Sequence, residues 1–376
     1  MDKLIDSLNR FSFETLQKIN SDDYTENTVF SPYSAFVCVS MSSPLFQEQT
    51  RAEILKSLQI SLDYSQNFDI FLHQLHDLIE KENTDKVCSS NRVWANQNLN
   101  FNPETFSKNK DILGVPIEAV NFPQPACDKI NEEVNRATKG MIPNLIKESD
   151  LSTKTAIALL NAIYFKCDWE KKFNIDPSSR SQEKLNFNLV DGSKIHVNLL
   201  RSFGRNLLYA ENDDFQVVSV PYLHSQYEFV IILPKDNSTN GYNLLKSLNY
   251  NEFNTNLLSK LRKEKVNIKM PKFSFESSLK LAPIFKELGM NKAFTDSAEC
   301  ADKNVKYQVD MIIQKAKIVL DENGTEAAAA TGMTMKLLSL DEDQEYNVFA
   351  DHPFVYLLRN KEMGTILFEG FVKNPQ

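Results

Sequence analysis

The chain offers few side chains suited to catalysis or metal binding. It has five histidines, of which His73 and His76 have the i, i+3 spacing at which one helix can present two metal ligands. No His-Glu-x-x-His pattern, cysteine cluster or nearby carboxylate motif accompanies them. We therefore interpret this pair as helix-surface residues and expect neither a metal site nor a cofactor.

Tyr222, His224 and Ser225 bring a nucleophile and a base close together in sequence. An imidazole can activate a hydroxyl group, but it needs a third group to orient it, and none stands in a known arrangement here. The chain also lacks the Gly-x-Ser-x-Gly and Gly-x-x-x-x-Gly-Lys-Ser/Thr motifs, and its 10 glycines are too few to favour phosphate-binding loops. No catalytic residue is assigned, and an enzyme is the least favoured interpretation.

The overall composition is that of a soluble globular protein. Of 376 residues, 42% are hydrophobic and 24% charged, and the net charge is −8. This acidic balance argues against binding to nucleic acid or heparin, because both need clustered Lys and Arg. No Gly/Ser-rich or Pro-rich linker divides the chain, which is long enough for one large core or for two domains.

The N-terminus and the cysteines bear on the cellular compartment. Leu4, Leu8 and Phe11 recur at helical spacing between charged residues, which predicts an amphipathic helix rather than a signal peptide. No stretch approaches the ~20 apolar residues of a membrane span. The five cysteines are widely spaced and odd in number. We expect a cytoplasmic protein, or one released outside the cell without a cleaved signal peptide, with no membrane partner.

The elements that must position any site alternate between helical and strand patterns. Ser31 before Pro32 predicts a helix start, and the apolar residues that follow predict a buried helix. Helical spacing also covers residues 69–80 and 127–147. Strands are predicted at 91–95, 158–165, 217–220, 228–233, 266–275, 313–320, 354–358 and 365–372. The predicted fold class is α+β, with large sheets covered by helices.

Residues 322–340 are the most informative segment of the chain. Their first half carries almost no bulk, and four consecutive alanines, 327–330, end at Thr331 and Gly332 before a helical stripe can develop. In an extended strand, Thr325, Ala327, Ala329 and Thr331 would share one face, and all four are small. The segment could be a surface loop, a short helical turn, or a strand that fits a crowded slot in a sheet.

This segment and several others resemble the serpins, the serine protease inhibitor superfamily, and in particular its signal-peptide-less, ovalbumin-like intracellular type (clade B). The similarity covers nearly the whole chain, and it is specific because the motifs occur in the family's order and spacing. The matching runs are residues 321–331, 349–354, 27–34, 161–169, 270–273 and 288–290.

The resemblance implies one domain over residues 1–376, acting as a monomer, with three β-sheets, about nine α-helices and a reactive loop within residues 322–348. In this family a target serine protease cleaves the loop and forms an acyl-enzyme; the loop then inserts into the main sheet and distorts the trapped protease. The nucleophile belongs to the protease, which agrees with the lack of catalytic motifs here. The implied hinge is Glu322, Gly324, Thr325, Glu326, Ala327, Ala328, Ala329, Ala330 and Thr331.

The reactive bond follows from the family's spacing. Counting fourteen residues on from Gly324 places it between Leu338 and Ser339, which suits a chymotrypsin-like, cathepsin G-like or elastase-like protease. The alternative bond, between Lys336 and Leu337, would suit a trypsin-like protease, and Met335 is a third choice. Inhibition of a cysteine protease and a non-inhibitory serpin acting as chaperone or carrier remain open. Acidic residues after the bond, Asp341, Glu342, Asp343 and Glu345, could steer proteases with a basic rim.

The resemblance also implies a polar cluster below the insertion point. It maps to Ser31, Ser34, Asn161 and Gln314, with Trp169 nearby in the same region. The family commonly has histidine where Gln314 stands, so sheet opening is expected to depend less on pH around 6 to 7. Asn323 and Glu133 also depart from the family pattern, but neither lies at an inward-facing position of the hinge.

Overall fold

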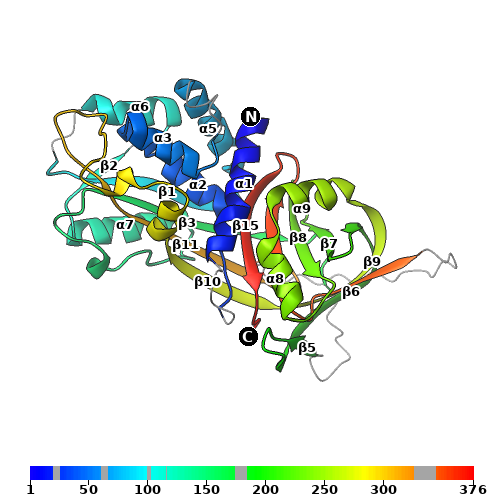
Figure 1. Cartoon of the computed structure of the whole chain (residues 1–376). Coiled ribbons are helices and arrows are strands. Elements are labelled where there is room, and N and C mark those ends of the chain that lie inside the picture. The colour runs from blue at the N-terminus through cyan, green and yellow to red at the C-terminus, as the bar shows by residue number, and fades with distance from the viewer. Residues whose placement is uncertain (20–25, 61–66, 100–102, 116, 174–183, 326–343) are drawn as a thin grey trace.

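The computed structural model describes residues 1–19, 26–60, 67–99, 103–115, 117–173, 184–325 and 344–376, and has the predicted α+β fold (Figure 1). Nine α-helices lie within these residues. They are α1 (Asp2–Ile19), α2 (Pro32–Ser40), α3 (Glu48–Ser57), α5 (Phe68–Glu82), α6 (Pro103–Leu113), α7 (Gln124–Ala137), α8 (Thr239–Ser247), α9 (Tyr250–Asn256) and α10 (Ala282–Glu287).

The main sheet is built around two adjacent parallel strands, β3 (Ile157–Phe165) and β11 (Val309–Leu320). Every residue of β3 is buried, as its continuous apolar run predicts for a strand covered on both faces. On one side β3 pairs with β1 (Val87–Asn96), which pairs with β2 (Glu118–Val120); on the other side β11 pairs with β10 (Phe273–Lys280). Two short strands, β12 (Gly324–Thr325) and β4 (Cys167–Asp168), complete the sheet at the end of β11.

The second sheet is larger and contains the other apolar strands. Its order is β13 (Glu345–Phe349), β9 (Arg262–Pro271), β6 (Lys194–Glu211), β7 (Phe215–Pro221), β8 (Tyr227–Pro234), β14 (Phe354–Asn360) and β15 (Thr365–Val372), with β5 (Lys184–Asn188) paired to β6. The resemblance implied three sheets in the whole molecule. The strands named here join into one sheet, so the described chain has two. The reason is β6, which continues through an irregularity between Ser202 and Arg205 and hydrogen-bonds to strands on both sides of it.

Helix α2 is the layer between the two sheets. It contacts β1 and β3 on one side and β15 on the other, and all nine of its residues are buried. Its start follows the predicted chemistry: the Ser31 hydroxyl accepts the Ser34 N–H at 3.1 Å, and Pro32 occupies the first turn. Helix α7 packs on the opposite face of the main sheet, against β1. Figure 1 shows α8 and α9 grouped over the second sheet.

Most predicted elements are confirmed, and the differences have physical causes. The helix predicted over 127–147 is α7, which ends at Ala137 because Lys139 and Gly140 adopt left-handed backbone conformations. The strand predicted over 266–275 is two strands, β9 and β10, separated at Lys272. Strands β2, β5, β6 and β13 were not predicted.

Candidate hinge and sheet-opening site

The hinge enters the main sheet between β11 and β4. Thr325 pairs with Leu320 of β11 and with Cys167 of β4, and Gly324 pairs with Asp168. The Thr325 side chain is fully buried, and its hydroxyl lies 2.6 Å from the hydroxyl of Tyr222. The first of the four small residues predicted to face inward is therefore already seated in the sheet.

Gly324 is required by the close approach of two backbones. A Cβ added at this position would lie 2.2 Å from the carbonyl oxygen of Cys167 and 2.6 Å from the Cα of Asp168. Both distances are far below van der Waals contact, and both neighbours are backbone atoms that cannot rotate away. Only glycine allows β12 to lie this close to β4.

A tight turn delivers the chain from β11 to β12. The Asp321 carboxylate accepts the backbone N–H groups of Asn323 at 2.8 Å and Gly324 at 3.2 Å, as acidic residues commonly do in turns. Trp169 fastens this turn, because its indole N–H donates to the Asp321 carbonyl at 2.9 Å and its backbone N–H donates to the Asn323 carbonyl at 2.8 Å. Its ring stacks on Tyr222 with 4.6 Å between centroids. The hinge is thus held at both ends of the turn.

Two lysines hold the polar side chains of the turn. Lys272 Nζ lies 2.9 Å from the Glu322 carboxylate, and Lys172 Nζ donates to the Asn323 side chain at 3.0 Å. Partial burial raises the pKa of Glu322, but the hydrogen bond and the charge of Lys272 outweigh this effect and keep the pKa below its ordinary value. Glu322 is therefore ionised at neutral pH.

The structure brings Ser31, Ser34, Asn161 and Gln314 together in the centre of the molecule. Gln314 accepts the Ser31 N–H at 2.7 Å and donates to the Ser31 carbonyl at 2.9 Å and to the Asn161 side chain at 2.8 Å. The Ser34 hydroxyl lies 3.1 Å from the same Asn161 oxygen. Asn161 and Gln314 are also register partners in the β3–β11 ladder, so this cluster joins both strands to the start of α2.

Asn91 belongs to the same cluster and was not predicted. Its side-chain oxygen lies 2.6 Å from the Ser34 hydroxyl, and it stands opposite Asn161 in the β1–β3 ladder. One signal in the sequence could have identified Asn91: it is a polar residue within a predicted strand, in register with Asn161. Trp169, by contrast, is not near the cluster: it follows Asn161 by eight residues, or roughly 26 Å of extended strand, and lies at the hinge.

The predicted residues beyond Thr325 divide into two groups. Those that lie outside the described part of the chain are Glu326, Ala327, Ala328, Ala329, Ala330, Thr331, Met335, both bonds Lys336–Leu337 and Leu338–Ser339, and Asp341 to Asp343. Glu345 is described and is not an isolated charge. Lys265 Nζ lies 3.6 Å from its carboxylate, and the Asn267 amide donates to it at 3.2 Å.

The catalytic and metal candidates do not assemble. Within the described residues no group of three or more His, Cys, Asp or Glu side chains could hold a metal ion. The Tyr222 hydroxyl is bonded to Thr325 rather than to His224. Glu133 forms an ion pair with Arg92 at 2.7 Å on the face of the sheet under α7. Among the helices described, none is long and apolar enough to cross a membrane.

Comparisons with known proteins agree with this architecture. The family model described as serpin (serine protease inhibitor) matches residues 6–375. The chain is 30% identical to Iripin-2 of Ixodes ricinus, covering 98% of this chain and 93% of that protein, and 28% identical to leukocyte elastase inhibitor of Xenopus laevis, covering 100% of both. Human thyroxine-binding globulin, solved with its hormone, has the same fold with a TM-score of 0.85 at 22% identity, over 100% of both chains.

Proposed function

The chain belongs to the serpin family of serine protease inhibitors, and on that premise we propose that it is an irreversible suicide inhibitor of a serine endopeptidase. The family membership makes it a protease inhibitor rather than an enzyme. The proposed mechanism is cleavage of the reactive loop, trapping of the acyl-enzyme, and insertion of the cleaved loop between β3 and β11. The covalent complex with the protease is the functional product.

The observation that carries this proposal is the position of the hinge relative to the β3–β11 ladder. These strands pair directly from Val309 to Lys317 and from Ile157 to Tyr164, and β12 lies directly beyond the end of that pairing. A strand continuing from Thr325 would have to separate β3 from β11 to enter the sheet. The next residues on the face of Thr325 are small and uncharged, so neither bulk nor a buried charge opposes their entry.

The proposed reactive bond is Leu338–Ser339, with Lys336–Leu337 as the alternative. A leucine before the bond suits a chymotrypsin-like, cathepsin G-like or elastase-like pocket, and the similarity to a leukocyte elastase inhibitor supports this class. A lysine would suit a trypsin-like pocket. We also propose a cytoplasmic monomer, with release from the cell as the alternative setting for an extracellular protease.

The test is incubation of the full chain with chymotrypsin, cathepsin G, elastase, trypsin and a papain-like protease, followed by denaturing gels and intact mass. We expect a covalent adduct with a serine protease and a released peptide that begins at Ser339. A peptide beginning at Leu337 would move the bond to Lys336. An adduct with the papain-like enzyme alone would make the target a cysteine protease. Cleavage without any adduct, and without a gain in thermal stability, would favour a non-inhibitory serpin.

Two neighbouring alanines provide a matched test of insertion. In the proposed inserted strand, counting alternate residues from Thr325, Ala327 would face into the sheet and Ala328 would face away from it. We expect Ala327→Arg to be cleaved as a substrate with little adduct, because a buried arginine opposes insertion. Ala328→Arg should still form the adduct. Equal adduct yields from the two variants would contradict insertion in this register.

A further inference from the structure

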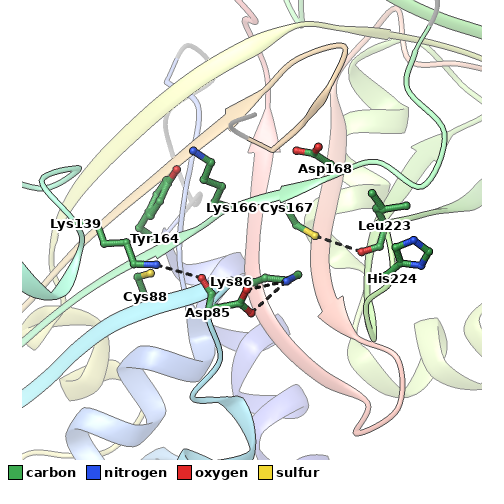
Figure 2. Close-up of a pocket in the computed structure, with 10 residues that line it drawn as sticks. All are labelled: Asp85, Lys86, Cys88, Lys139, Tyr164, Lys166, Cys167, Asp168, Leu223 and His224. Atoms are coloured by element: carbon green, nitrogen blue, oxygen red, sulfur yellow. Dashed lines mark hydrogen bonds and ion pairs between the residues drawn. The ribbon is translucent and has the colours of Figure 1, made fainter. Parts of the chain in front are cut away.

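A pocket of about 420 Å³ opens beside the hinge, on the side away from β11 (Figure 2). Its walls come from the start of β1, the ends of β3 and β4, the segment after α7 and the turn between β7 and β8. The volume is within the range of sites that enclose small organic ligands, roughly 300–1,000 Å³. Nothing in the proposed inhibitory mechanism uses this pocket.

The charged groups around the pocket leave an excess of positive charge. Three lysines line it, Lys86, Lys139 and Lys166, against two carboxylates, Asp85 and Asp168. Lys86 already lies 3.1 Å from both Asp85 oxygens, so this pair is neutralised. Among the described residues, Lys139 donates only to the backbone carbonyl of Asp85, at 3.3 Å. The remaining groups carry one net positive charge, which a single carboxylate would balance.

Tyr164 adds a polar group that lacks a partner. The residue lines the pocket and is only 2% exposed, and within the described chain its hydroxyl makes no hydrogen bond. A buried hydroxyl without a partner costs roughly 1–3 kcal/mol. The hydroxyl oxygen itself is buried, so a ligand oxygen supplies the missing acceptor only if this wall of the pocket adjusts on binding. Cys88 and Leu223 provide apolar surface beside it, so the pocket suits a ligand with an apolar body and one charged group.

Two residues of the pocket are held in an uncommon backbone conformation. Lys139 has φ 52° and His224 has φ 45°, both in the left-handed region, which costs about 1 kcal/mol or more for residues other than glycine. They come from different parts of the fold, one after α7 and the other in the β7–β8 turn. Such conformations gather at functional sites more often than elsewhere. Lys139 and His224 are two of the four non-glycine residues with positive φ in the described chain.

The pocket shares a wall with the hinge. Cys167 and Asp168 line it, and the same two residues pair with Thr325 and Gly324 on their other side. The Leu223 N–H donates to the Asp168 carbonyl at 2.8 Å, which ties β4 to the β7–β8 turn. Separation of β3 from β11 would move the β1, β3 and α7 walls relative to this turn.

From these observations we infer that the pocket binds a small organic monoanion, a carboxylate with a short apolar body, and that the bound anion slows insertion of the loop. Lys139 and Lys166 would hold the carboxylate, with the Tyr164 hydroxyl as a further donor. A ligand that contacts both the β3 side and the turn binds the present arrangement better than an opened one, and therefore stabilises it. The regulatory half of this inference, that the bound anion slows loop insertion, rests on the proposed function.

Binding is tested without any protease, by calorimetric titration of the full chain with benzoate. Benzylamine and benzamide are the matched cationic and neutral probes. We expect saturable binding of benzoate alone, weakened ~10-fold or more in Lys139→Gln and Lys166→Gln, since each change removes a charged hydrogen bond. Lys260→Gln, at an exposed site elsewhere, should bind as the wild type does. No saturable benzoate binding, or equal affinity in all variants, would overturn the assignment.

Tyr164→Phe tests the buried hydroxyl separately, because it keeps the aromatic wall and removes only one donor. We expect several-fold weaker benzoate binding without loss of thermal stability, since the hydroxyl has no partner to lose. Unchanged affinity in this variant would exclude the hydroxyl from the site.

The regulatory half is tested with whichever protease forms the adduct in the absence of benzoate. Saturating benzoate should slow adduct formation or divert more of the protein to simple cleavage, and Lys166→Gln should not respond. An unchanged rate would overturn the regulatory role while leaving the binding site in place. If no protease forms an adduct even without benzoate, the proposed function fails, and the calorimetric result still decides whether the site exists.

Discussion

Gln314 is the residue at which the two central strands and α2 meet. It is fully buried, and its amide both accepts from Ser31 and donates to Ser31 and Asn161. An amide can accept and donate at any pH, whereas an imidazole can do both only when neutral. The residue type at this position therefore decides whether the contact between β3 and β11 responds to pH.

Replacing Gln314 with histidine should create a pH dependence that the wild type lacks. A protonated imidazole cannot accept the Ser31 N–H, so folding lowers the pKa of the new histidine below its unfolded value near 6.5. The variant is then expected to lose stability as the pH falls below about 6.5, relative to the wild type. Chemical denaturation between pH 5 and 8 measures this difference. Parallel curves for the two proteins would contradict the assigned bonding.

Gly324→Ala should disturb the hinge directly. The added methyl group would collide with the backbone of β4, and we expect a loss of about 1–3 kcal/mol in the free energy of unfolding. Asn323→Ala is the control, because within the described chain its side chain accepts a hydrogen bond only from Lys172, at the surface of the turn. This change should cost about 0.5 kcal/mol or less. Equal stabilities of the two variants would mean that β12 does not require this close approach.

At the level of elements, β13 begins at Glu345, the last of the four acidic residues that follow the proposed reactive bond. It pairs with β9 in parallel, and this places Glu345 beside Lys265, where its charge is partly compensated. The sequence alone treated four acidic residues as one patch. The structure shows that Lys265 partly offsets the charge of Glu345, so this carboxylate contributes less to a long-range field than an unpaired one would.

Neutralising Asp341, Glu342 and Asp343 together to Asn and Gln should slow association with a basic-rimmed protease several-fold at low salt. Adding Glu345→Gln should change the rate little further, since Lys265 already offsets that carboxylate. Stopped-flow association rates at low and high salt measure both effects. A rate that is unchanged at low salt would exclude steering, and a large additional effect of Glu345 would contradict the pairing with Lys265.

The sequence predicted those elements whose pattern is complete within a short segment of the chain. The continuous apolar runs of β3 and β8 predict buried central strands, and the Ser31-Pro32 start predicts α2, because each pattern is complete within a few residues. β6 was missed because buried and exposed residues are mixed along it and no continuous apolar run marks it. At the site, the position of Trp169 against Asp321 depends on a contact between distant parts of the chain, which no spacing within either segment reveals.

On the scale of the whole molecule, a buried carboxyl group joins its first and last elements. Glu369 of β15 is fully buried, and one of its oxygens accepts the Ser12 hydroxyl of α1 at 2.5 Å while the other has no partner among the described residues. Burial raises the pKa of Glu369 to about 8, and the Ser12 hydrogen bond only partly opposes this. The group is therefore mainly protonated in the folded protein at neutral pH.

This carboxyl group should make the folded state less stable as the pH rises from about 4.5 to 8. In that window the unfolded chain releases the proton while the native state keeps it, so the free energy of unfolding falls by up to ~1.4 kcal/mol per pH unit. Glu369→Gln should remove this part of the slope. Glu82, whose pKa burial raises to about 7, should leave a similar fall below pH 7 in both proteins. An identical pH profile for wild type and variant would refute the assignment.

The position of β15 also affects how the chain can fold during synthesis. Helices α1 and α2 are synthesised long before β15, yet both bury apolar side chains against it. Until β15 is available, the side of each helix that it covers stays exposed, although α1 and α2 can already contact each other and α2 can contact β1 and β3. This apolar surface is open to association with other chains. The nascent chain should therefore need protection by chaperones until β15 has been synthesised, and shortening it within β15 should leave one side of both helices uncovered.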